Sequence, residues 1–296
     1  MNEPIIDITD LTKFYGKARG IENVNLEIGR GEVFGFIGPN GAGKSTTIRI
    51  LMNLIFPTGG SARIMGMDVV RQTKEIKRKV GYIPSDASAY SYMVVEEFLN
   101  YFARFYDVPD AGNRITELSN LFELDLKRKI SDLSTGNKKK VSIVQSLIHS
   151  PELIIMDEPT TGLDPLMQSV FFDLLRSENQ KGMTIFFSSH ILGEVQMFCR
   201  RVAIIKEGKI IQLEDIDTLR KKQLKKVTIE FNEQVDPETL SFLGIVDLVS
   251  GPGNALSFMF SGNINELVSF LSGEKINNLM IEEPSLDEIF MHYYQI

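Results

Sequence analysis

The chain has 296 residues, of which 43% are apolar and 24% are charged, and its formal net charge at pH 7 is −7. This length allows one or two domains with a large core, and the composition is typical of a soluble globular protein. The single cysteine, Cys199, excludes an intramolecular disulfide. No apolar run approaches the roughly 18 residues that a membrane-spanning helix needs, and the N-terminus lacks the pattern of a signal peptide.

The charge is distributed unevenly along the chain. From Val227 onward there is one lysine against eleven acidic residues, whereas the preceding part carries 31 basic and 28 acidic residues. This balance argues against a nucleic-acid-binding tail, and we expect no nucleic-acid partner.

The N-terminal part reads as two half-exposed strands, because residues 5–12 and 21–28 alternate between apolar and polar side chains. Tyr15 stands between them, directly before Gly16. A tyrosine at a strand end can present its ring face to an adenine base. An ordinary packed aromatic explains the residue equally well, so the local sequence leaves both interpretations open.

The next stretch fits the phosphate-binding pattern G-x-x-x-x-G-K-[ST] in full. A strand pattern over 32–37 precedes it and a helix pattern over 46–52 comes after it, so a bound phosphate meets the positive end of a helix. The glycines turn the backbone N–H groups inward, the lysine reaches the β- and γ-phosphates, and the serine hydroxyl is offered to Mg²⁺. The sequence therefore predicts a nucleotide site built from Gly38, Pro39, Asn40, Gly41, Ala42, Gly43, Lys44, Ser45 and Thr46.

A predominantly helical region is expected from about residue 85 to 150. Within it, residues 133–140 open a helix for which Ser134 is a plausible N-cap, and the free N–H groups of the first turn form a second candidate anion site. On these residues alone, the favoured interpretation is an ordinary helix start followed by a solvated run of lysines.

Two further apolar runs end in chemically active residues. Residues 153–157 predict a buried parallel strand that ends at Asp157 and Glu158, where α/β sheets place their sites. Asp157 is positioned to hold Mg²⁺ through water, and Glu158 to polarise a water against the γ-phosphate. A second such strand, 184–189, ends at His190. A lone histidine is usually structural, but one at this edge can hydrogen-bond a γ-phosphate.

In this order, the motifs resemble the ATP-binding subunit of ABC transporters over about residues 5 to 215. The resemblance implies that residues 38–46 are the Walker A loop, Asp157 the Walker B aspartate and Glu158 the catalytic glutamate. It favours Tyr15 as the adenine-stacking aromatic and His190 as the switch histidine. Two further segments take their roles from the resemblance: 133–137 is the LSGGQ-type signature, with Ser134 and Gly136 directed at a γ-phosphate, and 161–164, ending in Asp164, is the D-loop.

Two positions depart from the family pattern. Ser85 comes after Gly-Tyr-Ile-Pro where the family has a glutamine that contacts Mg²⁺ and the attacking water, so Asp86 or a water is left to substitute. The signature has Thr135 and Asn137 in place of the usual glycine and glutamine. Neither change removes Lys44 or Glu158, so hydrolysis is still expected.

The resemblance also implies partners and a location. Two ATP molecules with Mg²⁺ lie between two ATPase domains, so a homodimer or a paralogous ATPase partner is implied. A separate polytopic membrane permease converts closing and opening of the dimer into alternating access, at the cytoplasmic face of a bacterial membrane.

The tail predicts a second, smaller domain. Strands at 227–231, 245–249, 255–260 and 276–281 and helices at 237–243 and 265–271 give the order β-α-β-β-α-β, which is ferredoxin-like, and one more helix is expected at 285–294. Residues 283–290 resemble the end of ATPase subunits that serve bacterial drug, peptide-antibiotic, sodium and polysaccharide exporters. A dimerising or stabilising role is favoured over ligand sensing.

The expected fold is therefore an α/β P-loop ABC-type ATPase with a helical subdomain, residues 1–218, followed by a small α+β domain, residues 219–296. The expected function is ATP-driven export of a peptide, antibiotic or other amphipathic substrate. An ABC importer subunit is the nearest alternative. A soluble ABC-type ATPase acting on nucleic acid or ribosomes is disfavoured because Lys44 and Asp157 are only 113 positions apart, with no heptad run between them and no second cassette. A small-molecule kinase leaves the signature helix unexplained.

Overall fold

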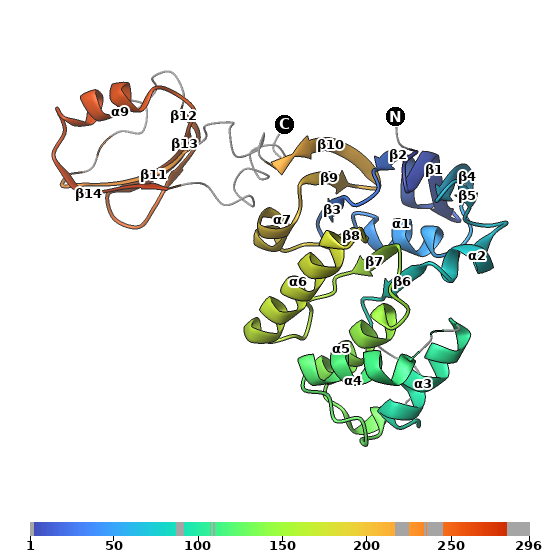
Figure 1. The fold of residues 1–296 in the computed structure, drawn as a ribbon. Helices are drawn as coiled ribbons and strands as arrows, with labels where there is room; N and C mark the ends of the chain where they lie inside the picture. Colours follow the sequence, from blue (N-terminus) through green and yellow to red (C-terminus); the bar gives the residue numbers. More distant parts are fainter. Residues whose placement is uncertain are drawn as a thin grey trace. The chain divides into compact units, whose positions relative to one another are not determined.

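The computed structural model describes residues 3–86, 92–106, 108, 110–216, 225–233, 235 and 245–282. The chain divides into two compact units, Met1–Glu214 and Asp215–Ile296, where the sequence predicts a boundary four residues later. The architecture is mixed α/β, as expected (Figure 1). The helices expected at 237–243 and 285–294, and the exporter-like motif at 283–290, lie outside the described residues.

A six-stranded sheet forms the centre of the first unit, in the order β10-β9-β3-β8-β7-β6. Its inner strands β3 (Val33–Ile37), β8 (Thr184–Ser189) and β7 (Leu153–Asp157) pair in parallel. Every residue of β7 and β8 is buried, which explains why both read as continuous apolar runs rather than alternating ones. The flanking strands are β6 (Val80–Ile83), β9 (Arg201–Lys206) and β10 (Lys209–Asp215).

Three neighbouring strands position the site through the segments that leave their carboxyl ends. The chain leaves β3 for α1 (Lys44–Leu51), β7 for α6 (Pro165–Gln180) and β8 for α7 (Leu192–Phe198). Since these strands are parallel, their carboxyl ends lie at one edge of the sheet, which brings the three segments together. Aromatic side chains fix the layer beneath, because the ring of Phe186 lies 6.1 Å from that of Phe34 and 5.6 Å from that of Phe36.

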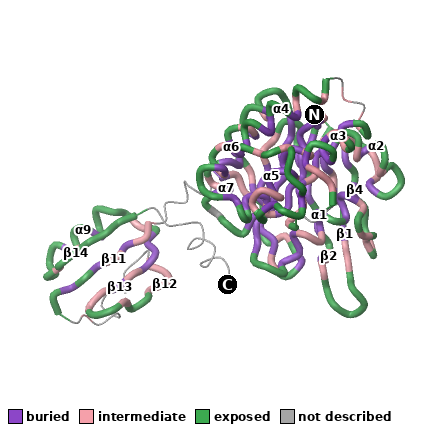
Figure 2. Tube along the Cα trace, turned by 90° about the horizontal axis from the view of Figure 1, so that it is seen from below, coloured by how far each residue is buried: buried purple, intermediate pink, exposed green. Residues whose placement is uncertain are grey.

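A second sheet, β2-β1-β4-β5, contains the N-terminal hairpin. Strands β1 (Ile6–Tyr15) and β2 (Ala18–Ile28) pair antiparallel and extend beyond the predicted ranges, and β1 also pairs with β4 (Gly59–Ile64). Next along the chain are β5 (Met67–Asp68) and α2 (Thr73–Lys77). Figure 2 shows the buried residues along the strands and the exposed ones over the outer surfaces.

Helices α3 (Val95–Phe105), α4 (Ala111–Leu121) and α5 (Thr135–Leu147), with the 3-10 turn η1 (Ile130–Asp132), form a helical lobe beyond β6 (Figure 1). None of the helices in the described part of the chain is long and apolar enough to cross a membrane.

The second unit has an antiparallel sheet in the order β12-β13-β11-β14. Its elements are β11 (Lys225–Phe231), β12 (Ile245–Ser250), β13 (Ala255–Phe260), α9 (Ile264–Leu271) and β14 (Ile276–Glu282). Their order along the chain agrees with the prediction. The ferredoxin-like arrangement stays a prediction, because its first helix lies outside the described residues.

Candidate ATP-binding and hydrolysis site

At two positions of the loop between β3 and α1, the surrounding atoms leave room only for glycine. A Cβ on Gly38 would lie 2.2 Å from the carbonyl oxygen of Ile205, and one on Gly43 would lie 2.6 Å from a methyl group of Ile21. Gly43 is also the N-cap of α1, has φ 113°, and provides no side chain to cap the helix. The first N–H groups of α1 are therefore left for an external acceptor, which is the arrangement that binds phosphate.

Lys44 is held inside this loop. Its side chain is 4% exposed, and Nζ donates hydrogen bonds to the carbonyl oxygens of Gly38 at 2.6 Å and Pro39 at 3.3 Å. The Lys44 Nζ also lies 3.6 Å from Oε1 of Glu158. A buried ammonium group strongly favours negative charge nearby, so Lys44 and the free N–H groups of α1 make this loop a candidate site for an anion.

The carboxylate of Glu158 is held between two groups. Besides Lys44, the Nδ1 atom of His190 lies 3.2 Å from the same oxygen, Oε1. Glu158 has a left-handed backbone with φ 49°, which is uncommon for a non-glycine residue. Its N–H donates to the carbonyl of Ser188 at 3.1 Å and to the Ser188 hydroxyl at 3.3 Å. The structure thus brings together the ends of β7 and β8, as their sequence pattern predicts.

Asp157 lies beneath Glu158 and is 1% exposed. The hydroxyl of Ser188, its register partner on β8, donates to Asp157 Oδ1 at 2.7 Å. Burial and the charge of Asp157 together raise the pKa of Tyr82 to about 12, against a lowering effect of Arg49. The phenol of Tyr82 is therefore a neutral neighbour of this carboxylate at physiological pH.

Lys44 and Glu158 line a pocket of about 220 Å³ beside the loop, whereas Asp157 and His190 are not among its lining residues. The Tyr15 ring is 47% exposed and lies at this pocket. Gly20 passes close to the ring, since a Cβ there would lie 2.9 Å from Tyr15 Cε2. The pocket is lined by Tyr15, Arg19, Gly20, Pro39, Asn40, Gly41, Gly43, Lys44, Ser45, Thr46 and Glu158.

The signature and D-loop residues are not among those that line this pocket. Ser134 is exposed and is the N-cap of α5, where its hydroxyl accepts a hydrogen bond from the N–H of Asn137 at 3.3 Å. Asp164 caps α6 in the same way, accepting from the N–H of Met167 at 3.0 Å. Gly136 lies against the D-loop, because a Cβ on it would lie 2.5 Å from the Gly162 carbonyl oxygen.

The prediction that the lysines at 138–140 form a solvated run is wrong. Lys139 is 2% exposed and Lys140 9%, and Lys138 is only half-exposed. Lys139 Nζ donates to the carbonyl oxygens of Pro84 and Ser85, each at 2.9 Å, and of Glu158 at 3.3 Å. The run begins a helix that packs against the sheet, so its second lysine points inward and finds carbonyl partners there.

Sequence reasoning missed three residues near the site. Ser188 orients Asp157, Arg19 lines the pocket, and Lys139 contacts the backbone of Glu158. Ser188 lies in the predicted strand that ends just before His190, and this position was the available signal for a residue near the site. Nothing local distinguishes Arg19 or Lys139 from surface cations.

Comparisons with known proteins agree with this geometry. The family model "ABC transporter" matches residues 21–161. The chain is 37% identical to the bacitracin transport ATP-binding protein BcrA of Bacillus licheniformis over 78% of this chain and 76% of that protein. It is 33% identical to the Nod factor export ATP-binding protein I of Paraburkholderia xenovorans, over 71% of each chain. Among solved structures, a dimeric post-hydrolysis state of the ATP-binding cassette MJ0796 with ADP and Pi matches with TM-score 0.66 and 26% identity, over 71% of this chain and 98% of that one.

Proposed function

The chain belongs to the ATP-binding proteins of ABC transporters, and on that premise we propose that it hydrolyses ATP between two such chains to power export through a separate membrane permease. The observation that carries the proposal is the pocket at which the aromatic Tyr15, the loop 38–46 and the carboxylate of Glu158 meet. The exporter assignment rests on relatives whose names refer to bacitracin transport and Nod factor export. The substrate class proposed is a peptide, antibiotic or other amphipathic molecule.

In the proposed mechanism, Tyr15 stacks on the adenine base, and the N–H groups of the loop with Lys44 hold the β- and γ-phosphates. Glu158 accepts the proton of the attacking water, which gains nucleophilicity as it attacks the γ-phosphorus. His190 orients the carboxylate of Glu158 through Nδ1 and, in the imidazolium form, which has an N–H on each ring nitrogen, donates to the γ-phosphate through Nε2. The bond from the β–γ bridging oxygen to phosphorus breaks, and ADP and inorganic phosphate leave.

The residues proposed for Mg²⁺ are Ser45 and Asp157. A hydroxyl and a carboxylate are the oxygen donors that this ion prefers, and Mg²⁺ typically keeps several waters and takes phosphate oxygens as well. The described residues contain no group of three or more His, Cys, Asp or Glu able to hold a metal. When bound, Mg²⁺ neutralises charge that develops on the phosphates.

The proposed dimer surface is the exposed strip that carries the signature and the D-loop. Ser134, Thr135, Gly162 and Asp164 are exposed or half-exposed and lie on adjoining segments, because Gly136 contacts Gly162. The N-terminus of α5 has backbone N–H groups that suit a γ-phosphate held by the loop of a second chain. This accounts for an anion-binding helix start that does not line the chain's own pocket.

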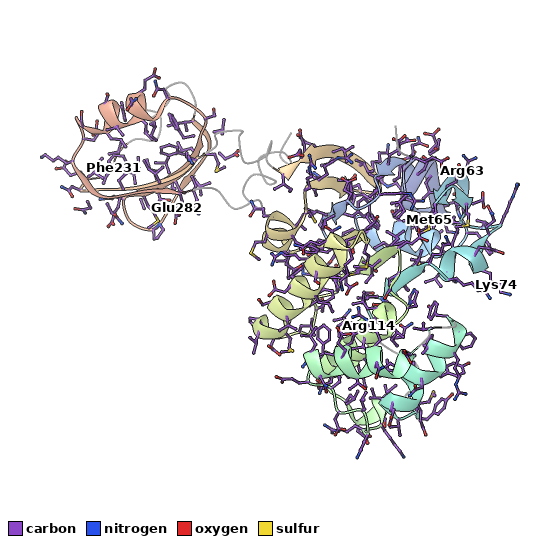
Figure 3. The ribbon with its side chains drawn as sticks, in the orientation of Figure 1. Arg63, Met65, Lys74, Arg114, Phe231 and Glu282 are labelled. Atoms are coloured by element: carbon purple, nitrogen blue, oxygen red, sulfur yellow. The ribbon has the colours of Figure 1, made fainter. Side chains whose placement is uncertain are left out.

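We place the permease at a groove of about 560 Å³ between α2 and α3. One side is basic, with Lys74, Lys77 and Arg78, and the other is aromatic, with Tyr101, Phe102, Phe105 and Tyr106. Phe105 is 58% exposed, and its ring packs edge-on at 4.9 Å from that of Tyr101. An amphipathic cytoplasmic segment of the permease with acidic residues matches this combination of charge and apolar surface. Lys74 is labelled on α2 in Figure 3.

The test of the ATPase proposal compares the parent chain with Glu158→Gln, and with Glu123→Gln as a control at an exposed glutamate. We expect Glu158→Gln to lose hydrolysis by about 100-fold or more while it keeps ATP affinity. Light scattering in ATP should show a trapped dimer for Glu158→Gln and a transient one for the parent. Unchanged turnover in Glu158→Gln would exclude this residue as the base.

The test of the permease groove uses Phe105→Glu, with Phe56→Glu as the control because Phe56 is also exposed, at 62%, but lies outside the groove. Phe105→Glu should lose co-purification with a polytopic protein from solubilised membranes and keep the basal ATPase rate. Retention of that membrane protein by Phe105→Glu would remove the groove as its docking site.

A further inference from the structure

Lys139 is a buried cation that, within the described residues, donates its hydrogen bonds to backbone carbonyls. It lies in the second turn of α5, five residues after the N-cap Ser134. The Nζ atom donates to Pro84 O at 2.9 Å, Ser85 O at 2.9 Å and Glu158 O at 3.3 Å. An ammonium group has three N–H donors, so this set of partners uses all of them.

These carbonyls come from two different strand ends. Pro84 and Ser85 directly follow β6, and Glu158 directly follows β7. The lysine itself comes from the helix that begins at the signature. One side chain therefore joins three segments that line or approach the ATP site, and two of these contacts join residues more than 50 positions apart in the chain.

The bond to Glu158 acts on a strained backbone. Glu158 has φ 49°, a conformation that persists only where its surroundings hold it. Its N–H donates to Ser188, and its carbonyl accepts from Lys139 at 3.3 Å and from the N–H of Thr161 at 3.4 Å. Together these contacts fix the peptide groups on either side of the Glu158 Cα, and hence the direction in which the carboxylate points. Of the two donors to the carbonyl, only Lys139 also binds the segment after β6.

The charge of Lys139 suits this position. Burial lowers the pKa of Lys139, while the carboxylates of Asp157, Asp86 and Glu158 raise it in part. An apolar side chain at this position would remove the ammonium donor from the carbonyls of Pro84 and Ser85 and leave the Glu158 carbonyl with the N–H of Thr161, at 3.4 Å. Buried polar groups that lose their partners are strongly unfavourable. The lysine is consequently not interchangeable with a methionine of similar length.

We propose that Lys139 is a positioning residue for ATP hydrolysis, which fixes the backbone of Glu158 and couples it to the segment 84–86. The inference rests on the proposed role of Glu158 as the base. It gives a physical role to the segment in which Ser85 stands where the family has glutamine. In this chain the link between that segment and the glutamate runs through Ser85's carbonyl and the Lys139 ammonium, and does not need a long side chain at position 85.

The test measures kcat and KM for ATP in Lys139→Met, Lys139→Arg and the control Lys138→Met. Because Lys139 lies behind Glu158 and does not line the pocket, we expect Lys139→Met to lower kcat about 10- to 100-fold with KM unchanged within about twofold. Lys139→Arg, which keeps the charge and the donors, should recover at least part of the lost kcat. Lys138→Met should retain the parent rate.

A readout independent of turnover is amide hydrogen exchange in the presence of ATP. In Lys139→Met, the amides of residues 85, 86, 157, 158 and 160 should exchange faster and those of β8 at the parent rate, whereas a general loss of stability would speed exchange throughout. If Lys139→Met does not fold, Lys139→Gln, which keeps two N–H donors but not the charge, replaces it in both measurements.

The possible outcomes separate this inference from the function on which it rests. An inactive Glu158→Gln with a fully active Lys139→Met overturns the role of Lys139 alone. An active Glu158→Gln overturns the proposed base, and the role of Lys139 with it. A raised KM with unchanged kcat in Lys139→Met assigns the residue to binding and also overturns the inference.

Discussion

His190 Nδ1 lies 3.2 Å from Oε1 of Glu158, the carboxylate oxygen that also lies 3.6 Å from Lys44 Nζ. The His190 side chain is 44% exposed, whereas the Lys44 side chain is 4% exposed. The carboxylate is therefore contacted by one buried cation and by one more accessible ring.

We predict that His190→Ala lowers kcat about 10- to 100-fold while the affinity for ATP changes little, because a carboxylate free to rotate spends less time in reach of the attacking water. His190→Gln retains a side-chain donor and should keep more of the rate than alanine. The measurement is steady-state hydrolysis with ATP affinity determined separately. A rise in KM with kcat intact would place His190 in binding rather than in the orientation of Glu158.

The candidate site residues that the sequence predicts are those that lie within short sequence motifs. The loop 38–46 and the carboxylates at 157 and 158 each combine a recognisable pattern with an adjacent buried strand, so their residues could be identified without a structure. The meeting of Glu158 and His190 could be expected because parallel strands share one edge.

Contacts between distant segments could not be predicted. The burial of Lys139 depends on carbonyls of residues 84, 85 and 158, and its neighbour Lys138 has the same local sequence character but is half-exposed. The strand lengths were also underestimated: β1 continues to Tyr15 because pairing with β2 extends through polar residues. Periodicity carries no information about such pairing.

The ion pair between Arg114 of α4 and Glu178 of α6 joins the helical lobe to the helix that follows strand β7 of the central sheet. The Arg114 Nη2 atom lies 2.8 Å from Glu178 Oε1, and the two side chains are 18% and 8% exposed. Arg114 is labelled on α4 in Figure 3. We predict that Arg114→Met lowers the free energy of unfolding by about 3 kcal/mol, because the carboxylate of Glu178 stays buried and, among the described residues, keeps Lys181 as its one charged partner. Urea unfolding followed by circular dichroism measures this loss, with Arg176→Met, which removes an exposed ion pair, as the control.

The same ion pair should depend on pH. Burial raises the pKa of Glu178, but the hydrogen bonds and charges of Arg114 and Lys181 outweigh it, so the pKa lies below its ordinary value of 4.5. A carboxyl whose pKa is lower in the folded state contributes stability that is fully present above the unfolded pKa and is lost as the pH falls through the folded pKa. The difference in unfolding free energy between the parent and Arg114→Met should therefore be constant at neutral pH and shrink below about pH 4.5. A difference independent of pH would show that packing of the Arg114 side chain, and not its charge, stabilises the contact.

Two glycines of the phosphate loop should respond differently to alanine. At Gly43 the backbone has φ 113° and an added Cβ would lie 2.6 Å from Ile21 Cγ2, whereas at Gly41 the backbone has φ 80° and an added Cβ would meet nothing within 4 Å. We predict that Gly41→Ala lowers the free energy of unfolding by about 1 kcal/mol, from backbone strain alone, and that Gly43→Ala lowers it by about 3 kcal/mol or more, because steric overlap is added. Equal losses in thermal or chemical unfolding would mean that the loop moves to relieve the overlap at Gly43.

The exposed ring of Tyr15 gives a test of how the base is bound. Lys13 Nζ lies 5.3 Å from the ring centroid, and Gly20 passes so close to Cε2 that an added Cβ would be 2.9 Å away, while the ring itself stays 47% exposed at the pocket. Stacking on a base requires the ring face and not the hydroxyl. Tyr15→Ala should therefore weaken ATP affinity about 10-fold, and Tyr15→Phe should retain it.

The choice of nucleotide separates stacking from hydrogen bonding. Because every base has a π-face, Tyr15→Ala should lower the affinity for GTP by about the same factor as the affinity for ATP. Inorganic triphosphate has no base, so it should bind the parent and Tyr15→Ala with equal affinity. Equilibrium binding of the three ligands at one salt concentration makes the comparison. A loss in Tyr15→Phe equal to that in Tyr15→Ala would assign the contact to the phenol hydroxyl, and a loss of triphosphate binding would mean that Tyr15 acts by supporting the phosphate loop.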